Sequence, residues 1–231
     1  TPGGTWNKIG NDFNQGTVRF NKQGNYPIGM NHNTDSSIDG KYVITGTSRT
    51  DGPVPWRAYE YDGSDWIQRG TDPIRDDNTG YYYLGNSQKI NNDGTVIVVG
   101  NTYTNGDWYG SLHAYEWNGS DWQAKGSVIE YPYSDDRAYF GSQVAINGDG
   151  TIIATTAPDS DEYATAFGAA FVYQFINGDW VQLGNDIYGK ESYEKLGTYG
   201  FSMNNAGNRI VFGAYENDDA GDDAGCIRIY E

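Results

Sequence analysis

Short apolar runs separated by Asp-Gly and Asn-Gly turns recur along the whole chain. They are clearest in four consecutive stretches: 140–146, which alternates, 151–156, which is β-branched, 168–175 and 180–184. Asp149-Gly150 lies between the first two runs and Asn177-Gly178 between the last two, and such dipeptides supply the positive φ angles of tight hairpin turns. The pattern predicts four antiparallel strands in a row, and no ten-residue segment has the 3.6-residue period of a helix.

A fourfold repeat underlies these runs. Each unit has a tryptophan followed four positions later by a glycine, and these tryptophans are Trp6, Trp66, Trp122 and Trp180, at intervals of 60, 56 and 58 residues. A tyrosine precedes the later three tryptophans by seven positions, and Tyr230 has the same spacing to Trp6 if the chain ends are joined. Because a unit of about 58 residues cannot bury its own apolar side, the repeat predicts a single all-β domain over residues 1–231.

Four strands in each of four units predict a four-bladed β-propeller. The blades would cover residues 11–70, 71–126, 127–184, and 185–231 together with 1–10. In this hypothesis the N-terminal strand 6–10 pairs beside 227–230 and covers an edge that would otherwise be exposed. The four repeated tryptophans, Trp6, Trp66, Trp122 and Trp180, are then structural residues between blades, and stacking on a ligand is their alternative role.

The units resemble FG-GAP repeats, from which integrin-α-type propellers are built. The resemblance lies in Phe140-Gly141 with Ala157-Pro158 and in Leu196-Gly197 with Gly213-Ala214, with weaker versions at 84–85 with Gly100 and at 28–29 with Gly46. It implies an extracellular adhesion or recognition module. Two departures stand out: integrin-type rings have seven blades, and the short turns here carry one aspartate each, too few for the six to eight oxygens that calcium prefers.

The long connections of a propeller lie on one side of the molecule. They run from the second strand of a unit to the third and from the fourth strand to the next unit, and we call their side the long-loop face. It carries 20 of the 31 acidic residues and many aromatic ones, a composition suited to a protein or glycan partner. The candidate partner-binding residues are Asp76, Asp77, Tyr82, Asp107, Trp108, Tyr109, Tyr133, Asp135, Asp136 and Tyr193. Alternatively, the tyrosines pack on neighbouring loops and the aspartates only solvate the rim.

Charge and hydropathy exclude several classes of partner. The net charge of −16 argues against nucleic acid and against docking on anionic lipid, both of which require a basic surface. An acidic surface that only maintains solubility is the alternative explanation of this charge. No run of about 18 apolar residues is present, so no membrane span is expected. The single cysteine, Cys226, cannot form an internal disulfide.

No catalytic or cofactor signature emerges, and no cofactor is expected. The densest carboxylate cluster, which contains Asp218, Asp219, Asp222 and Asp223, is a candidate site for weakly bound Ca²⁺ or another cation, and flexible solvated charge is its alternative explanation. His32 and His113 are the only histidines, too few for a zinc cluster. A glycosidase-like enzyme needs only two positioned carboxylates, so a carbohydrate-active enzyme working on the long-loop face is the alternative to a non-catalytic module.

The remaining signals concern location. Asn118-Gly119-Ser120 is an N-glycosylation sequon in a predicted turn. Thr1-Pro2-Gly3-Gly4 resembles a processed end, which fits a secreted or lumenal protein as well as an expressed fragment. We therefore expect an extracellular or organelle-lumenal recognition, adhesion or assembly module, with membership of a larger extracellular assembly as one setting.

Overall fold

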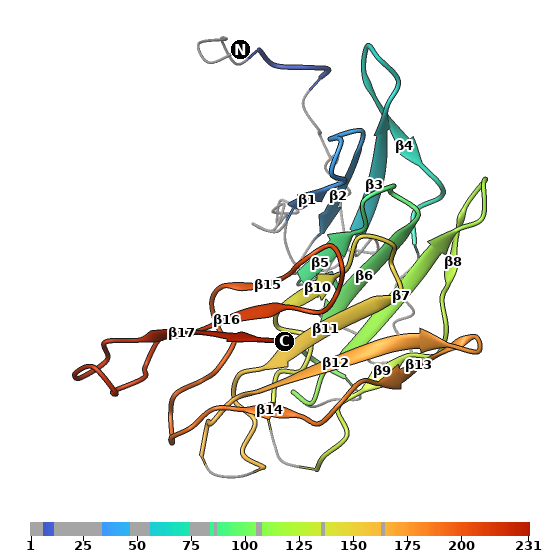
Figure 1. Cartoon of the computed structure of the whole chain (residues 1–231). Coiled ribbons are helices and arrows are strands. Elements are labelled where there is room, and N and C mark those ends of the chain that lie inside the picture. Colours follow the sequence, from blue (N-terminus) through green and yellow to red (C-terminus); the bar gives the residue numbers. More distant parts are fainter. Residues whose placement is uncertain are drawn as a thin grey trace, which may run out of the picture.

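The fold consists of strands that form four separate antiparallel sheets in chain order. A computed structural model describes residues 7–11, 34–46, 56–73, 84–85, 87–104, 108–134, 137–162 and 165–231, and every regular element in these ranges is a β-strand. Figure 1 shows the sheets spread like a fan. The all-β class and the repeating antiparallel unit predicted from the sequence are confirmed.

Three of the sheets have the predicted four strands in sequence order. The first sheet contains β1 (Thr34–Ser36), β2 (Tyr42–Gly46), β3 (Trp56–Tyr61) and β4 (Trp66–Arg69). The second contains β5 (Ser87–Ile90), β6 (Val96–Asn101), β7 (Ser111–Trp117) and β8 (Trp122–Ala124), and the short β9 (Ile129–Glu130) also pairs with β7. The third contains β10 (Val144–Ile146), β11 (Ile152–Ala157), β12 (Ala169–Ile176) and β13 (Asp179–Gln182), and β14 (Ile187–Tyr188) also pairs with β12.

Within the described residues, the fourth sheet has three strands, β15 (Phe201–Met203), β16 (Ile210–Ala214) and β17 (Cys226–Tyr230). In all four sheets the first strand is the inner one, since β1, β5, β10 and β15 contact one another in turn. Backbone bonds between hairpin turns tie the inner ends together: Asn92 N donates to Gly148 O at 3.1 Å, and Gly148 N donates to Asn205 O at 2.9 Å.

The apolar core lies between successive sheets rather than in one central mass. Trp56 from the first sheet packs with Ile97 and Val99 from the second. Phe140 and Phe171 fill the space between the second and third sheets. Smaller residues from the third sheet meet Phe212 from the fourth. A sheet inside the stack is therefore covered on both sides, which explains why every residue of β6 is buried.

Close backbone approach between the second and third sheets requires glycine at two positions of the second. A Cβ atom added to Gly100 would lie 2.1 Å from the carbonyl oxygen of Gly141 in the next sheet, and one added to Gly110 would lie 1.9 Å from that of Phe140. These distances leave no room for a side chain. The Phe-Gly pair at 140–141 thus serves contact between sheets.

A tryptophan and the aspartate before it join the outer strands of successive sheets. Trp122 Nε1 donates to Arg69 O at 2.9 Å, and the carboxylate of Asp121 accepts from the backbone N of Thr71 at 2.9 Å and from its hydroxyl at 2.7 Å. Trp180 and Asp179 repeat this arrangement one sheet later, on Lys125 O at 2.6 Å and on the backbone N and hydroxyl of Ser127 at 2.7 and 3.1 Å. We call this arrangement the Asp-Trp clamp.

The same clamp holds the N-terminal segment 7–11 on the first sheet. Trp66 Nε1 donates to Ile9 O at 3.3 Å, and Asp65 accepts from the backbone N of Asn11 at 2.8 Å and from its side-chain amide at 2.5 Å. Segment 7–11 therefore occupies the place of a preceding outer strand. Trp6 itself lies outside the described residues.

The predicted ring closure does not occur in this structure. Segment 7–11 does not pair with 227–230, and Figure 1 shows it well apart from the C-terminus. In the part of the chain that the structure describes, β17 is instead an edge strand, on which Ile227 and Ile229 are 75% and 71% exposed. The physical reason is that the clamp on segment 7–11 uses only groups of the first sheet and forms without any contact to the fourth.

Replacing Trp122 by Phe tests the clamp. The ring remains but the hydrogen bond to Arg69 O is lost, so we expect the free energy of unfolding to fall by about 0.5–1.5 kcal/mol for the bond alone. Urea unfolding measures it. Trp117→Phe is the matched control, because Trp117 is a neighbouring indole that takes no part in the clamp. Equal losses in both variants would show that ring size, and not the clamp, matters.

Acid should weaken the clamps. Hydrogen bonds, chiefly from the backbone of Ser127, hold the pKa of Asp179 below its ordinary value, and those from Thr71, its hydroxyl foremost, do the same for Asp121. A carboxyl whose folded-state pKa is depressed stabilises the fold fully above the unfolded-state pKa of about 3.9 and loses that effect as pH falls through the folded-state pKa. We expect the stability difference between the wild type and Asp179→Asn, measured by urea unfolding, to shrink below about pH 4. A constant difference down to pH 2 would contradict this.

Candidate recognition face

The long-loop face is only partly described, which divides the candidate residues into two groups. Trp108 and Tyr109 lie in the connection from β6 to β7, Tyr133 between β9 and β10, and Tyr193 between β14 and β15. The other candidates lie outside the described residues, namely Asp76, Asp77, Tyr82, Asp107, Asp135 and Asp136. The geometry of the face is therefore built from the first group and its neighbours.

Trp108 is the centre of an aromatic cluster at the boundary of the second and third sheets. Its ring lies 4.9 Å from that of Tyr103 and 5.1 Å from that of Tyr139, centroid to centroid. The two loops are tied by backbone bonds, because Tyr139 N donates to Trp108 O at 2.9 Å and Phe140 N donates to Tyr109 O at 3.0 Å. All three rings of the cluster are partly exposed. They form a supported aromatic surface that two different loops contribute.

Tyr139 takes a left-handed backbone conformation, with φ of 55°. A non-glycine residue in that region is uncommon and carries strain, which the bonds to the neighbouring loop hold in place. The sequence showed Tyr139 only as one of many aromatics in the loops and gave no reason to single out Tyr103. Tyr109 faces the core rather than the cluster, since it packs against the apolar residues between the second and third sheets.

Tyr133 takes part in the loop packing. Its ring lies 5.6 Å from that of Tyr131, and its hydroxyl donates to the carboxylate of Asp186, which also accepts from Tyr188 at 2.8 Å. The bond to Asp186 is the main cause that raises the pKa of Tyr133, and burial is the main cause for Tyr188. Tyr193, in contrast, is mostly exposed. Among the candidate tyrosines, Tyr109 and Tyr133 therefore pack inside the molecule, whereas Tyr193 is exposed to solvent.

A second aromatic and acidic group lies at the boundary of the third and fourth sheets. The exposed rings of Tyr199 and Tyr215 are 5.1 Å apart, and Lys195 Nζ lies 3.8 Å from the carboxylate of Glu216. Asp159 belongs to the same group: burial raises the pKa of its carboxyl, while nearby Lys195 partly offsets the shift. A hydrogen bond to Glu216 raises the pKa of Tyr215 to about 12.

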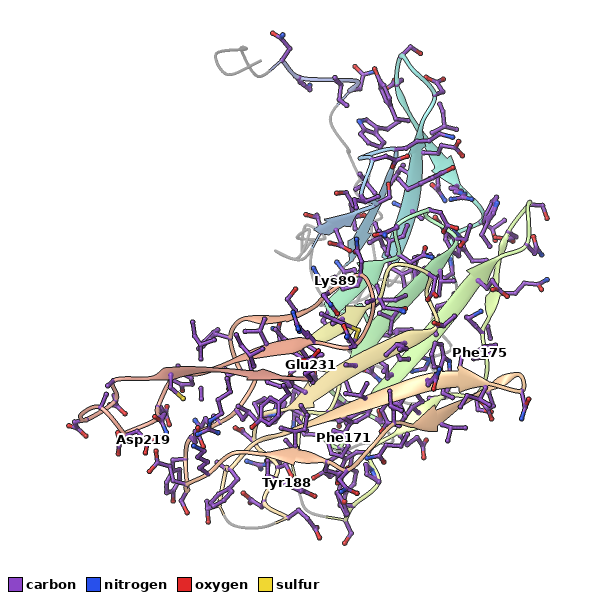
Figure 2. All side chains as sticks on the ribbon, in the orientation of Figure 1. Lys89, Phe171, Phe175, Tyr188, Asp219 and Glu231 are labelled. Carbon is purple, nitrogen blue, oxygen red and sulfur yellow. The ribbon has the colours of Figure 1, made fainter. Side chains whose placement is uncertain are left out.

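The Asp218–Asp223 loop is held by hydrogen bonds within the loop and to a neighbouring carboxylate. The carboxylate of Asp218 accepts from the backbone N of Asp223 at 2.8 Å, and the backbone N of Asp218 donates to Glu191 at 2.9 Å. Figure 2 shows Asp219 on the outlying loop between β16 and β17. Among the residues that the structure describes, no three His, Cys, Asp or Glu side chains converge to hold a metal ion. The four aspartates, Asp222 included, therefore do not form a preassembled cation site.

The sequence did not reveal that Glu194 and His113 are buried. Glu194 is fully buried and forms an ion pair with Arg228 of β17, and it also accepts from the backbone N of Lys190. His113 lies 3.0 Å from the hydroxyl of Ser111, and burial lowers its pKa to about 4, so it is neutral at physiological pH. Glu194 anchors a long loop to the fourth sheet rather than adding charge to the surface. The sequence held one signal of this ion pair. Arg228 lies between two isoleucines in a predicted strand, and a charged side chain in such a place indicates a buried partner.

The sequon lies on the opposite side of the molecule. Asn118 is exposed at the hairpin between β7 and β8, and its side-chain oxygen accepts from the backbone N of Ser120 and of Asp121, both at 2.9 Å. A glycan attached there would not cover the long-loop face.

No family model and no curated protein matches the chain, so the FG-GAP resemblance is not shown at the level of a family. Solved structures do share the fold. TolB from Acinetobacter baumannii has a TM-score of 0.50 at 14% identity, over 87% of this chain and 40% of that one. A complex of KlAtg21 with the coiled coil of AgAtg16 gives 0.53 at 9% identity, over 82% of this chain and 49% of that one.

A putative TolB from Agrobacterium tumefaciens gives 0.43 at 14% identity, over 78% of this chain and 52% of that one. This chain thus spans about half the length, or less, of the chains it resembles. TolB is a β-propeller protein, so the comparison supports a propeller-like fold and nothing finer. No helix that could cross a membrane occurs in the described part of the chain.

The pKa of Asp159 is raised, whereas those of the clamp residues Asp121 and Asp179 are lowered. Asp159 therefore predicts the opposite dependence of stability on pH. A carboxyl whose pKa is raised by burial destabilises the folded state once pH exceeds the unfolded-state pKa, because the unfolded chain then releases its proton more readily. Asp159→Asn should therefore raise the free energy of unfolding at pH 7 and leave it unchanged near pH 3. Urea unfolding at both pH values measures this. A loss of stability at pH 7 would mean that Lys195 outweighs burial.

Proposed function

We propose that this chain is a non-catalytic recognition module that binds a glycan or a protein partner through the long-loop face. The observation that carries the proposal is the cluster of Tyr103, Trp108 and Tyr139. Three partly exposed rings held by two loops form a surface of fixed shape. Rigid aromatic rings give large contact areas at low cost in conformational entropy, and they stack on sugar rings as well as on apolar side chains.

Net charge and the carboxylates near the cluster limit which partners can bind. The chain carries a net charge of −16, which disfavours polyanions and favours neutral or cationic surfaces. Carboxylates in the same loops can accept hydrogen bonds from sugar hydroxyls or from Lys and Arg side chains. A weakly held cation at the Asp218–Asp223 loop, formed only when a partner adds ligands, belongs to the same proposal. So does a secreted or lumenal location, which the exposed sequon at Asn118 would suit.

One observation favours a second candidate, a carbohydrate-active enzyme. Asp159 is a half-buried carboxyl with a raised pKa, close to Asp161 and Glu216 and beside the exposed pair Tyr199 and Tyr215. A carboxyl that keeps its proton to higher pH is what a general acid in glycoside hydrolysis requires. Release of reducing sugar from a polysaccharide panel, abolished in Asp159→Asn, would favour the enzyme. Retention without turnover would favour the binding module.

Trp108→Ala tests the binding proposal. Because it removes the central ring of the cluster, we expect affinity for a captured glycan or protein to fall about tenfold or more. A glycan array and capture from extracellular fluid, each followed by titration, supply the ligand and the measurement. Trp117→Ala, which removes an indole outside this face, is the control. Equal binding by the wild type and Trp108→Ala, with both variants folded, would sink the proposal for this cluster.

A further inference from the structure

The loop contact that carries Trp108 and Tyr139 recurs one sheet later with different side chains. At the boundary of the second and third sheets, Tyr139 N donates to Trp108 O at 2.9 Å, and at that of the third and fourth, Lys195 N donates to Ala166 O at 3.0 Å. Tyr139 and Lys195 share a left-handed backbone, with φ of 55° and 49°. Each also directly precedes the Phe-Gly or Leu-Gly pair of its unit. Lys195 therefore corresponds to Tyr139, and Ala166 corresponds to Trp108.

This correspondence shows that the loop backbone does not require the aromatic rings. Ala166 makes the same backbone contact as Trp108 with only a methyl group, and Lys195 adopts the same conformation as Tyr139. The indole and the phenol nevertheless lie together, 5.1 Å apart between ring centroids, and both are partly exposed. Partly exposed aromatic rings that the local backbone does not need are typical of a binding surface.

Charged side chains occupy the corresponding place at the next boundary. Burial raises the pKa of Asp159, as do the nearby Asp161 and Glu216, whereas nearby Lys195 lowers it. Lys195 Nζ lies 3.8 Å from the carboxylate of Glu216, which also accepts a hydrogen bond from the exposed Tyr215. We call Asp159, Asp161 and Glu216 the acidic group. Lys195 offsets only part of its negative charge.

The aromatic cluster and the acidic group adjoin on the long-loop face. Asp159 N donates to Ala138 O at 3.4 Å, and Ala138 directly precedes Tyr139 in the chain. Arg137, one residue further back, is exposed and adds a positive charge, but it and Lys195 together do not cancel the three carboxylates. An extended chain advances about 3.4 Å per residue. A short segment of a partner can therefore contact both sites.

The chemistry of the two sites favours one class of partner. A sugar hydroxyl can donate to a carboxylate, but it leaves the excess negative charge in place. An arginine guanidinium donates two hydrogen bonds to a carboxylate, neutralises it, and also stacks on aromatic rings. The chain stacks its own arginine in this way, since the guanidinium of Arg69 lies 4.3 Å from the ring centroid of Tyr42 and 4.4 Å from that of Trp117. An arginine-containing segment thus suits both sites, whereas a neutral glycan suits only the first.

We propose that the partner is a protein that presents two nearby arginines in an extended segment. One guanidinium stacks on the aromatic cluster at Trp108, and the other pairs with Glu216 and Asp159 of the acidic group. This inference rests on the proposed recognition function and names the partner of the same face. The net charge of −16 speeds the association, and added salt weakens it.

Fluorescence anisotropy with labelled peptides is the first test. The probes contain two arginines separated by glycine spacers of increasing length, and a matched series has lysine in place of arginine. Because lysine stacks less well and forms no bidentate pair, we expect the best arginine peptide to bind about tenfold more tightly than its lysine analogue at physiological salt. Equal binding of the two series at every spacing overturns the proposal, because net charge alone would then explain it. So does the absence of binding.

Variants of the two sites provide the second test. Trp108→Ala removes the stacking ring and Glu216→Gln removes one carboxylate charge, so each should lower the affinity for that arginine peptide about tenfold. Glu60→Gln is the matched control, since Glu60 is a partly exposed carboxylate beside the hairpin between β3 and β4 and its substitution removes the same charge. It should change the affinity less than about twofold. Equal losses in Glu216→Gln and Glu60→Gln overturn the proposal.

A glycan array separates the failure of this inference from the failure of the proposed function. A glycan that binds the wild type and not Trp108→Ala, without any binding of the arginine peptides, would keep the recognition function and overturn the arginine partner. If neither the peptides nor any glycan or captured protein binds, both proposals fail.

Discussion

The arrangement of this molecule depends on how one sheet holds the next. Each described sheet pair inside the stack shares an apolar core, but burial is non-directional and does not set the register of two sheets. Between the first and second and between the second and third sheets the Asp-Trp clamp does, because an indole N–H and a carboxylate meet a carbonyl and an amide at fixed positions of the preceding segment. The clamp also forms on segment 7–11, which belongs to none of the sheets among the described residues.

The long-loop face follows from the same stacking. Trp108 and Tyr139 come from different sheets, so their rings meet only because the second and third sheets are held in register. The group around Asp159 and Tyr215 likewise joins loops of the third and fourth sheets. Candidate binding residues thus gather at sheet boundaries rather than on single loops. A change at the clamp between the second and third sheets should therefore shift the Trp108 and Tyr139 rings relative to each other without altering either residue.

Much of the fold could be predicted from local signals. Asp-Gly turns and β-branched runs gave the strands, and the tryptophan period gave the units, because both depend on a few neighbouring residues. The prediction of ring closure was wrong, since the equal spacing of Tyr230 and Trp6 does not determine where segment 7–11 lies, and the structure holds that segment on the first sheet. The roles of individual loop residues were harder to predict than the fold. Tyr133 and Glu194 resembled surface residues, and only their partners Asp186 and Arg228, distant in sequence, show that they are structural.

Amide hydrogen exchange at Thr71 and Ser127 tests the clamp most directly. Both residues follow an outer strand, and their backbone N–H groups donate to a carboxylate of the next sheet rather than to a strand partner. Protection in the wild type, lost at Thr71 in Asp121→Ala and at Ser127 in Asp179→Ala, is the result that this account predicts. Exchange at the rate of a free amide in the wild type would contradict it.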